Sequence, residues 1–161
     1  MANTQAAAAA AKRDLVLELL LDAPREKLYR CWTEPQLLMQ FFAPKPWTTA
    51  HAELDVRAGG TSYAVMRSPE GQEFPSRGVY LEVVPNAKIV FTDAFESAWV
   101  PSNKPFFVGT ILFEDAGEGK TRYTAIASHW TDEDRDAHEK MGFHQGWGQV
   151  AGQLEALAKT I

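Results

Sequence analysis

The stretch from Thr48 to Trp130 is a succession of short β-like segments separated by turn residues. Ser68-Pro-Glu-Gly71 has proline and glycine where a type I turn favours them, and residues 115–119 form a second glycine-containing turn. Strands joined by links this short pair antiparallel, because a parallel crossover needs about a dozen residues or more. We therefore predict an antiparallel meander with strands over 49–56, 61–67, 76–84, 88–93, 106–114 and 120–130.

One strand and two short helices are predicted before the meander. Leucine alternates with other residues over 15–21, which indicates a largely buried first strand. Asp22 and Pro24 are typical of a helix start with Asp22 as the cap, and Pro35 ends that helix and opens a second one. The residues expected to give these helices an apolar side are Leu28, Cys31, Trp32, Leu37, Leu38, Phe41 and Phe42.

The C-terminal residues 131–161 are predicted to form one long helix that begins at a Thr131 cap. Its second half carries an apolar stripe at helical spacing, made of Phe143, Trp147, Val150, Leu154, Leu157 and Ile161. The same face of the front half is polar. We expect the rear half to anchor the helix on the sheet and the front half, 132–145, to form the lip of a pocket.

These elements indicate an α+β fold, because an antiparallel sheet with one apolar face must cover that face with the available helices. The predicted architecture is a curved seven-stranded antiparallel sheet wrapped around the long C-terminal helix, with the two short helices between strands 1 and 2. A curled sheet encloses more volume than one helix fills. The surplus is predicted to hold either bulky aromatic packing or a cavity.

Composition narrows the functional classes. The net charge is −5 and Lys and Arg are scattered, which argues against a nucleic-acid partner. The single cysteine, Cys31, permits a reducing compartment, and no apolar run is long enough for a membrane span. Residues 1–13 read as a disordered or frayed Ala-rich tail before a single domain over 14–161, and a cytoplasmic location is expected.

Several short motifs, in this order, resemble those of a bacterial protein family: Cys31-Trp-Thr-Glu-Pro35, Asp55-Val-Arg-Ala-Gly-Gly60, Pro69-Glu-Gly71, Gly78-Val-Tyr-Leu-Glu-Val-Val-Pro85, Ile89-Val-Phe-Thr92, Gly119-Lys-Thr-Arg122 and Gly146-Trp147. The chain is similar to SRPBCC (START-like, helix-grip) proteins, in the subfamily that resembles the C-terminal domain of the heat-shock protein 90 ATPase activator. The resemblance implies a hydrophobic cavity between a curved sheet and the C-terminal helix. Superfamily members bind lipids, sterols, hormones or polyketides, and a minority are enzymes.

Candidate cavity residues follow from this architecture. His138, Met141 and Gln145 occupy neighbouring angles of the terminal helix and would form a mixed wall if that side turns inward, whereas a solvated face is the alternative. The full set of candidates is His138, Met141, Gln145, Phe143, Tyr63, Met66, Tyr80, Phe91, Phe107, Tyr123 and Trp99. The strand register decides which of the strand residues face inward, since a slip of one residue exchanges the two faces.

No catalytic, metal or cofactor site is predicted. His138 and His144 lie six positions apart and point to different sides of a helix, and His51 and His129 belong to no ligand-spaced pair. Cys31 lies on the core side of its helix and is expected to be a buried, unreactive thiol. An enzyme would depend on an acid or base such as His138 or Glu82, and that alternative has only superfamily analogy behind it.

The favoured function is binding of a small apolar or amphipathic molecule. The first alternative is a polyketide cyclase-like or hydrolase-like enzyme, and the second is a co-chaperone that activates a heat-shock protein 90 type ATPase. The apolar loop 94–105, with Trp99, could gate the pocket together with Trp47, form a homodimer patch, or simply pack on the domain.

Overall fold

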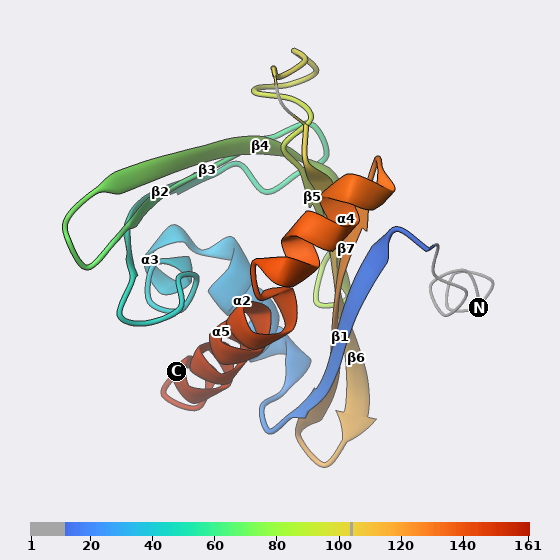
Figure 1. Cartoon of the computed structure of the whole chain (residues 1–161). Helices are drawn as coiled ribbons and strands as arrows, with labels where there is room; N and C mark the ends of the chain where they lie inside the picture. Colours follow the sequence, from blue (N-terminus) through green and yellow to red (C-terminus); the bar gives the residue numbers. More distant parts are fainter. Residues whose placement is uncertain (1–11, 104) are drawn as a thin grey trace.

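The computed structural model describes residues 12–103 and 105–161, and it confirms the predicted α+β helix-grip fold. Seven antiparallel strands form one sheet in the order β1-β7-β6-β5-β4-β3-β2. Two short helices lie between β1 and β2, and two more follow β7 (Figure 1). The elements are β1 (Asp14–Leu21), α2 (Arg25–Thr33), α3 (Pro35–Leu38), β2 (Thr48–Leu54), β3 (Thr61–Arg67), β4 (Glu73–Val84), β5 (Lys88–Thr92), β6 (Phe107–Gly117), β7 (Lys120–His129), α4 (Asp132–Lys140) and α5 (Phe143–Ala158).

The six predicted meander strands are confirmed, and two of them are longer than predicted. β4 begins at Glu73 rather than near residue 76, so the β3–β4 hairpin forms an arm that projects beyond the end of β5. The pair Arg67 and Glu73 closes this arm next to the turn, with a guanidinium-to-carboxylate distance of 2.6 Å. Because β5 ends at Thr92, which pairs with Val79, the part of β4 before Val79 has no partner on the β5 side.

The first helix lacks its predicted cap. Pro24, not Asp22, is the N-cap residue of α2, and no side chain caps this end. The carboxylate of Asp22 instead lies 3.4 Å from Nζ of Lys159 and 3.7 Å from Nζ of Lys120. Leu28, Cys31 and Trp32 are buried as predicted. α3 ends at Leu38, so the fully buried Phe41 follows the second helix rather than belonging to it.

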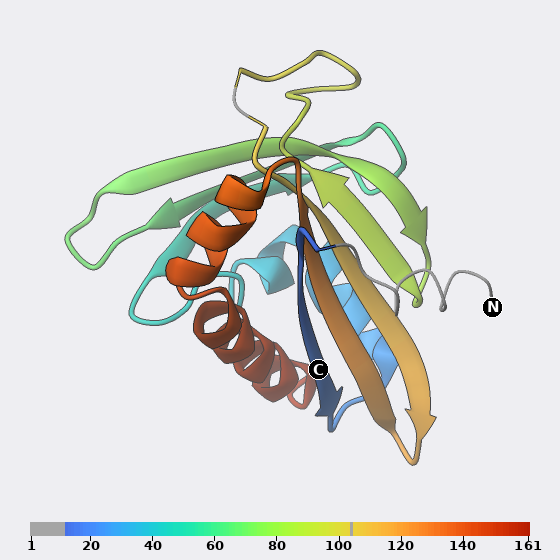
Figure 2. The same cartoon turned by 45° about the vertical axis from the view of Figure 1, so that its right-hand side comes forward.

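The long C-terminal helix is confirmed as α5, but it begins at Phe143 and is not continuous from residue 131 as predicted. The chain forms two helices that are separated at Gly142, which has a left-handed backbone with φ of 94° (Figure 2). Glycine adopts this conformation without the steric cost that a Cβ atom brings. Thr131 caps α4 as predicted, because its side chain accepts a hydrogen bond from the backbone N–H of Asp134 at 3.0 Å.

The main core lies between the concave face of the sheet and the helices α2 and α5. The predicted stripe faces inward: Leu154 is fully buried in this core, and Trp147, Val150, Leu157 and Ile161, which follows α5, are partly buried against it. Phe143 is fully buried in a smaller neighbouring cluster. The N-terminal tail prediction concerns mostly residues 1–11, which lie outside the described part. Arg13, at its end, makes defined contacts with Asp132 and with the backbone of Trp130.

Candidate functional site

An apolar pocket of about 100 Å³ lies between the concave face of the sheet and the two short helices. Its helical wall comes from α2 and the segment that begins with α3, and its floor comes from β2 to β6. The apolar lining residues are Trp32, Leu38, Phe42, Leu54, Ala64, Val79, Tyr80, Phe91 and Phe107. A volume of this size is below the roughly 300–1,000 Å³ of drug-sized sites, and it is comparable with the ~150 Å³ engineered cavity that takes up benzene.

Trp32 is the anchor of the helical wall. Its ring stacks on Phe91 at a centroid distance of 6.1 Å and meets Phe42 edge-on at 5.9 Å. The indole Nε1–H donates a hydrogen bond to the hydroxyl of Tyr123 at 3.2 Å, inside the core. Burial raises the pKa of Tyr123 well above its usual value, so this hydroxyl remains protonated. These contacts fix the orientation of the indole that closes one side of the pocket.

Two small residues make room for the aromatic floor. A Cβ atom on Gly109 of β6 would lie 2.4 Å from the Phe91 ring, so glycine lets Phe91 lie across the neighbouring strand. A Cβ atom on Gly78 would lie 2.3 Å from the carbonyl oxygen of Thr92, where β4 loses its β5 partner. The positions of Gly78 and Gly109 therefore shape the floor by close backbone and ring contacts.

Polar groups of the pocket come from β3, β4 and the end of β5, and they include the charged Arg77 and Asp93. Ser62, Ser76 and Tyr80 contribute hydroxyls from β3 and β4. Burial raises the pKa of Tyr80 to about 12, and a hydrogen bond with Ser62 offsets only part of this rise. The Thr92 hydroxyl already donates to the backbone oxygen of Phe107 at 3.0 Å. At neutral pH the pocket thus offers uncharged hydroxyls from Ser62 and Tyr80.

The pocket adjoins a wider groove at the free edge of β4, with a volume of about 650 Å³. Ser76, Arg77 and Asp93 line both spaces. The guanidinium of Arg77 lies 4.1 Å above the ring of Tyr63, a cation–π contact. The groove also carries Glu96, Ser102 and Asn103 from the loop after β5.

Asp93 holds both ends of that loop. Its Oδ1 accepts hydrogen bonds from the backbone N–H groups of Phe106 and Phe107 at 2.8 and 3.3 Å, and its backbone oxygen accepts from the Ser102 hydroxyl. At the tip, Trp99 is 55% exposed and meets Phe95 edge-on, and its ring would contact a Cβ placed on Gly59 at 3.4 Å. The loop therefore borders the groove through its polar residues and packs its tryptophan on the β2–β3 turn.

The predicted cavity residues are found in several places. Tyr80, Phe91 and Phe107 line the pocket, and Tyr63 lines the groove. Tyr123 is buried behind Trp32, and Met66 is half-buried on β3. Met141 is 74% exposed and Gln145 is also exposed, because the bend at Gly142 leaves them on the outer side of the helices. A role in ligand binding stays a prediction for all of these residues.

Helices α2 and α3, rather than the C-terminal helices, form the helical wall of the pocket. Within the described residues, no lining residue comes from α4 or α5. The expected pocket lip over 132–145 is therefore not part of this pocket. Its members His138 and Phe143 instead belong to a second, aromatic cluster.

His138 and His129 form a buried pair that sequence reasoning missed. The two side chains are 7% and 8% exposed, and Nδ1 of His138 lies 2.9 Å from Nε2 of His129. Nδ1 of His129 lies 2.8 Å from the backbone oxygen of Arg13. Because a carbonyl oxygen only accepts, Nδ1 of His129 carries a proton and donates it to the oxygen of Arg13. Nε2 of His129 and Nδ1 of His138 share one further proton in the hydrogen bond between the two rings. His129 was considered on its strand alone, and only the folded chain places it against α4.

Burial in an aromatic cage explains the electrostatics of His138. Its ring lies 5.0 to 5.9 Å, between centroids, from the rings of Phe106, Phe107, Phe143 and Trp147. Desolvation, and secondly the nearby His129, lowers the pKa of His138 from 6.5 to about 4. His138 is the buried residue of an otherwise polar α4. The hydrogen-bonded pair thus attaches this helix to the end of the sheet.

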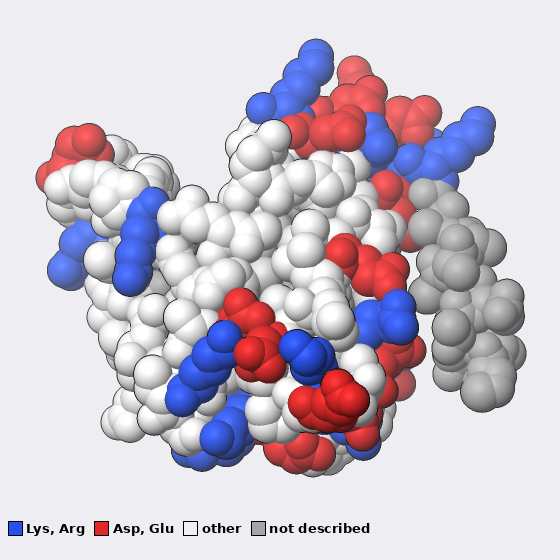
Figure 3. Space-filling view, turned by 90° about the horizontal axis from the view of Figure 1, so that it is seen from below, with Lys and Arg blue, Asp and Glu red and all other residues white. Residues whose placement is uncertain are grey.

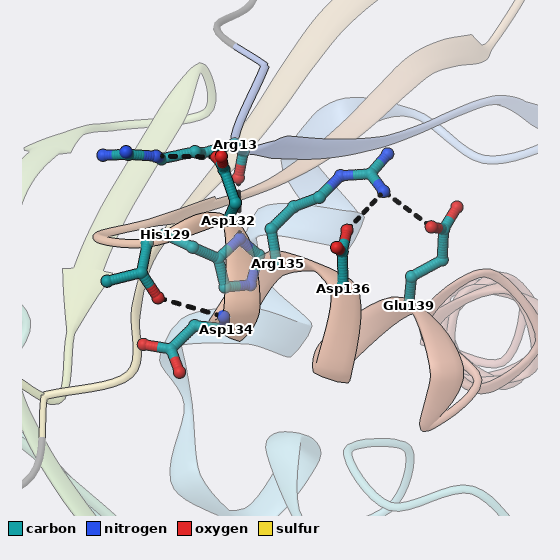
Figure 4. Close-up of polar contacts among 8 residues, drawn as sticks. Arg13, His129, Asp132, Asp134, Arg135, Asp136 and Glu139 are labelled. Carbon is teal, nitrogen blue, oxygen red and sulfur yellow. Dashed lines mark hydrogen bonds and ion pairs between the residues drawn. The ribbon is translucent and has the colours of Figure 1, made fainter.

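The outer side of α4 carries exposed ion pairs (Figure 4). Nε of Arg13 lies 3.0 Å from Asp132, and Arg135 reaches Glu139 at 2.6 Å and Asp136 at 3.3 Å. Such solvated pairs are worth roughly 0–1 kcal/mol each, so they add little to the attachment of α4. They mark this helix as a solvent-facing element.

Figure 3 shows a broad uncharged area on the face seen from below, with Lys, Arg, Asp and Glu gathered in separate groups around it. None of the helices in the described part of the chain is long and apolar enough to cross a membrane.

The residues considered for catalysis do not meet in the pocket. Glu82 is exposed and pairs with Nζ of Lys88 at 3.0 Å, and His138 lies in the aromatic cage. Burial raises the pKa of the Cys31 thiol to about 11, which keeps it protonated at neutral pH. Across residues 12–103 and 105–161, no three His, Cys, Asp or Glu side chains are grouped to hold a metal ion.

Solved structures share this architecture. A crystal structure of protein NE0264 from Nitrosomonas europaea is 39% identical, covers 94% of this chain and 97% of its own, and has a TM-score of 0.90. A protein from Rhodobacter sphaeroides (18% identity, 92% and 93% coverage, TM-score 0.79) and an AHSA1-like protein from Aeromonas hydrophila (15% identity, 91% and 92% coverage, TM-score 0.70) share the fold.

The family comparison covers nearly all of the domain. No curated protein matches the chain. The model of the Activator of Hsp90 ATPase homolog 1-like family matches residues 22–159, from the end of β1 to the last turn of α5. The chain therefore belongs to this family, within the SRPBCC helix-grip superfamily.

Proposed function

We propose that this protein binds a small apolar or amphipathic molecule in the pocket between the concave sheet and α2–α3. The observation that carries the proposal is the pocket itself, which is lined by aromatic and aliphatic side chains and adjoins a polar groove. Apolar concave sites with a few convergent polar groups are the usual form of small-molecule sites. The hydroxyls of Ser62 and Tyr80 give the pocket uncharged hydrogen-bonding groups, and the charged Arg77 and Asp93 lie where it adjoins the groove.

The volume limits the ligand. About 100 Å³ accommodates one ring or a short branched chain, with any further part of the molecule extending into the groove. Sterols and long lipid chains do not fit this space without an opening of the sheet from the helices. The proposal therefore favours ligands of a few to about ten heavy atoms in the pocket.

A filled pocket tests the proposal. Ala64 is buried on the floor, and Ala64→Leu would occupy part of the space. Ala156→Leu, an equal substitution on the exposed side of α5, is the matched control. We expect one-ring aromatic compounds to raise the melting temperature of the wild type and of the Ala156→Leu variant, with a smaller rise for Ala64→Leu. Equal shifts in all three proteins, or none in any, would reject the pocket as the binding site.

A further inference from the structure

We propose that the pocket selects neutral one-ring aromatic molecules that carry a hydrogen-bond-accepting oxygen, with phenol as the simplest representative. This inference rests on the proposed function and names the ligand class of the same site. Three features support it: the shape of the apolar walls, the hydroxyls of Ser62 and Tyr80, and the charges at the mouth.

The walls fit a flat ring. Trp32 and Phe91 lie nearly parallel, at 29°, while Phe42 is perpendicular to Trp32 at 87°. Aromatic pairs favour offset-stacked or edge-to-face contacts, and a ligand ring in this pocket finds partners for both. The volume of about 100 Å³ admits a single ring and excludes a fused system.

Ser62 and Tyr80 supply the polar end. Both hydroxyls line the pocket and together carry two protons, and a hydrogen bond between them would use only one. Over the described residues, neither hydroxyl has another hydrogen-bonded partner, so the second proton is available to a ligand oxygen. Tyr80 is only 3% exposed, and a buried hydroxyl gains when its hydrogen-bonding capacity is met. A ligand oxygen next to this pair would accept a hydrogen bond from the remaining hydroxyl proton. A methyl group at the same place would leave that buried hydroxyl without a hydrogen-bond acceptor.

The mouth does not favour a carboxylate. Arg77 is directed onto the Tyr63 ring, and the groove also carries the carboxylates of Asp93 and Glu96. One positive and two negative groups line this groove, and the pocket interior contributes uncharged hydroxyls from Ser62 and Tyr80. An anionic ligand would lose its hydration, and the guanidinium of Arg77 is opposed there by the carboxylates of Asp93 and Glu96. Neutral oxygen-containing rings avoid that cost.

Phenol, toluene and benzoate test the inference, because all three have one ring and one substituent. Their dissociation constants would be measured by following backbone amide shifts in NMR titrations of the full chain at neutral pH. We expect phenol to bind about three- to tenfold more tightly than toluene, since one hydrogen bond is worth about 0.5–1.5 kcal/mol. Benzoate is expected to bind at least about tenfold more weakly than phenol.

Two variants assign the effect to the hydroxyl pair. Tyr80→Phe and Ser62→Ala should each weaken phenol binding by about two- to tenfold and leave toluene binding unchanged. Ser128→Ala removes a serine hydroxyl from β7, outside both the pocket and the groove, and should change neither. Ser62→Ala keeps the test decisive if Tyr80→Phe fails to fold.

The outcomes are distinguishable. Equal binding of phenol and toluene, or tightest binding of benzoate, would overturn this inference and leave the proposed function standing. Phenol binding that is insensitive to both variants would overturn it as well. Failure of all three compounds to bind would reject the proposed function and, with it, the inference.

Discussion

Nδ1 of His138 on α4 is hydrogen-bonded to Nε2 of His129 at the end of β7, and the two nitrogens are 2.9 Å apart. Nδ1 of His129 donates a second hydrogen bond to the backbone oxygen of Arg13, directly before β1. Because Phe107 touches His138 and also lines the pocket, the pair stabilises the side of the sheet that borders the candidate site.

Acid is expected to weaken the fold through His138. The folded protein lowers the pKa of His138 from 6.5 to about 4, so the unfolded chain takes up the proton first. The stabilisation is fully present above pH 6.5 and is lost as the pH falls from 6.5 towards 4. The free energy of unfolding, measured in urea, should decrease by about 2 kcal/mol between pH 7 and pH 5.

The variant His138→Asn should remove most of this pH dependence, although it lowers stability at pH 7. His144→Asn, at an exposed position of α5, is the control and should retain the wild-type slope. An unchanged slope in His138→Asn would contradict the assignment.

Alanine substitutions at Gly152 and Gly142, in and before α5, should change the free energy of unfolding in opposite directions. Gly152 is exposed within α5, and an added Cβ meets nothing within 4 Å. Gly152→Ala should therefore raise the free energy of unfolding by about 0.5–1 kcal/mol. Gly142→Ala should lower it by about 1–2 kcal/mol, because φ of 94° is unfavourable for alanine. Thermal unfolding would measure both changes, and stabilisation by Gly142→Ala would argue against the break between α4 and α5.

Removal of the Tyr123 hydroxyl should destabilise the core. Tyr123→Phe leaves the buried Nε1–H of Trp32 without its acceptor, which costs about 1–3 kcal/mol. Denaturant unfolding would show the loss, and Tyr63→Phe, on the groove, should stay within about 0.5 kcal/mol of the wild type. Equal stabilities of the two variants would show that the Trp32–Tyr123 hydrogen bond does not contribute.

Asp93 should control the order of the loop after β5. Asp93→Ala removes the acceptor of the Phe106 and Phe107 amides, and hydrogen exchange at these two amides should become about tenfold or more faster. Asp93→Asn keeps an oxygen acceptor and should have a smaller effect. Protection that persists in Asp93→Ala would mean that other contacts hold the loop.

The meander could be predicted because its evidence is local. Turn residues such as Gly71 and Gly119 fix where strands end, and short links fix their antiparallel pairing. The apolar stripe of α5 was equally visible in the spacing of Phe143 and Leu154. The break at Gly142 could not be predicted in this way. Gly146, Gly148 and Gly152 follow it in the sequence, and nothing in the spacing shows that Gly142 alone takes the left-handed conformation.

The candidate site depended on contacts that are distant in sequence. Tyr80, Phe91 and Phe107 were named as candidates from their strands, whereas Trp32 and Leu38 line the pocket because α2 and α3 pack beneath β2 to β5. The helix–sheet arrangement, not periodicity, decides which helix forms the wall. The His129–His138 pair likewise needs the turn at residues 130–131, which returns α4 to the end of β7.

The most direct test of the central claim is a crystal structure of the protein soaked with toluene or pressurised with xenon, both of which occupy small apolar cavities. We predict density for the bound probe between Trp32, Tyr80 and Phe91, under the β3–β5 part of the sheet. A pocket that takes up neither probe, or density only between the sheet and α5, would contradict the account.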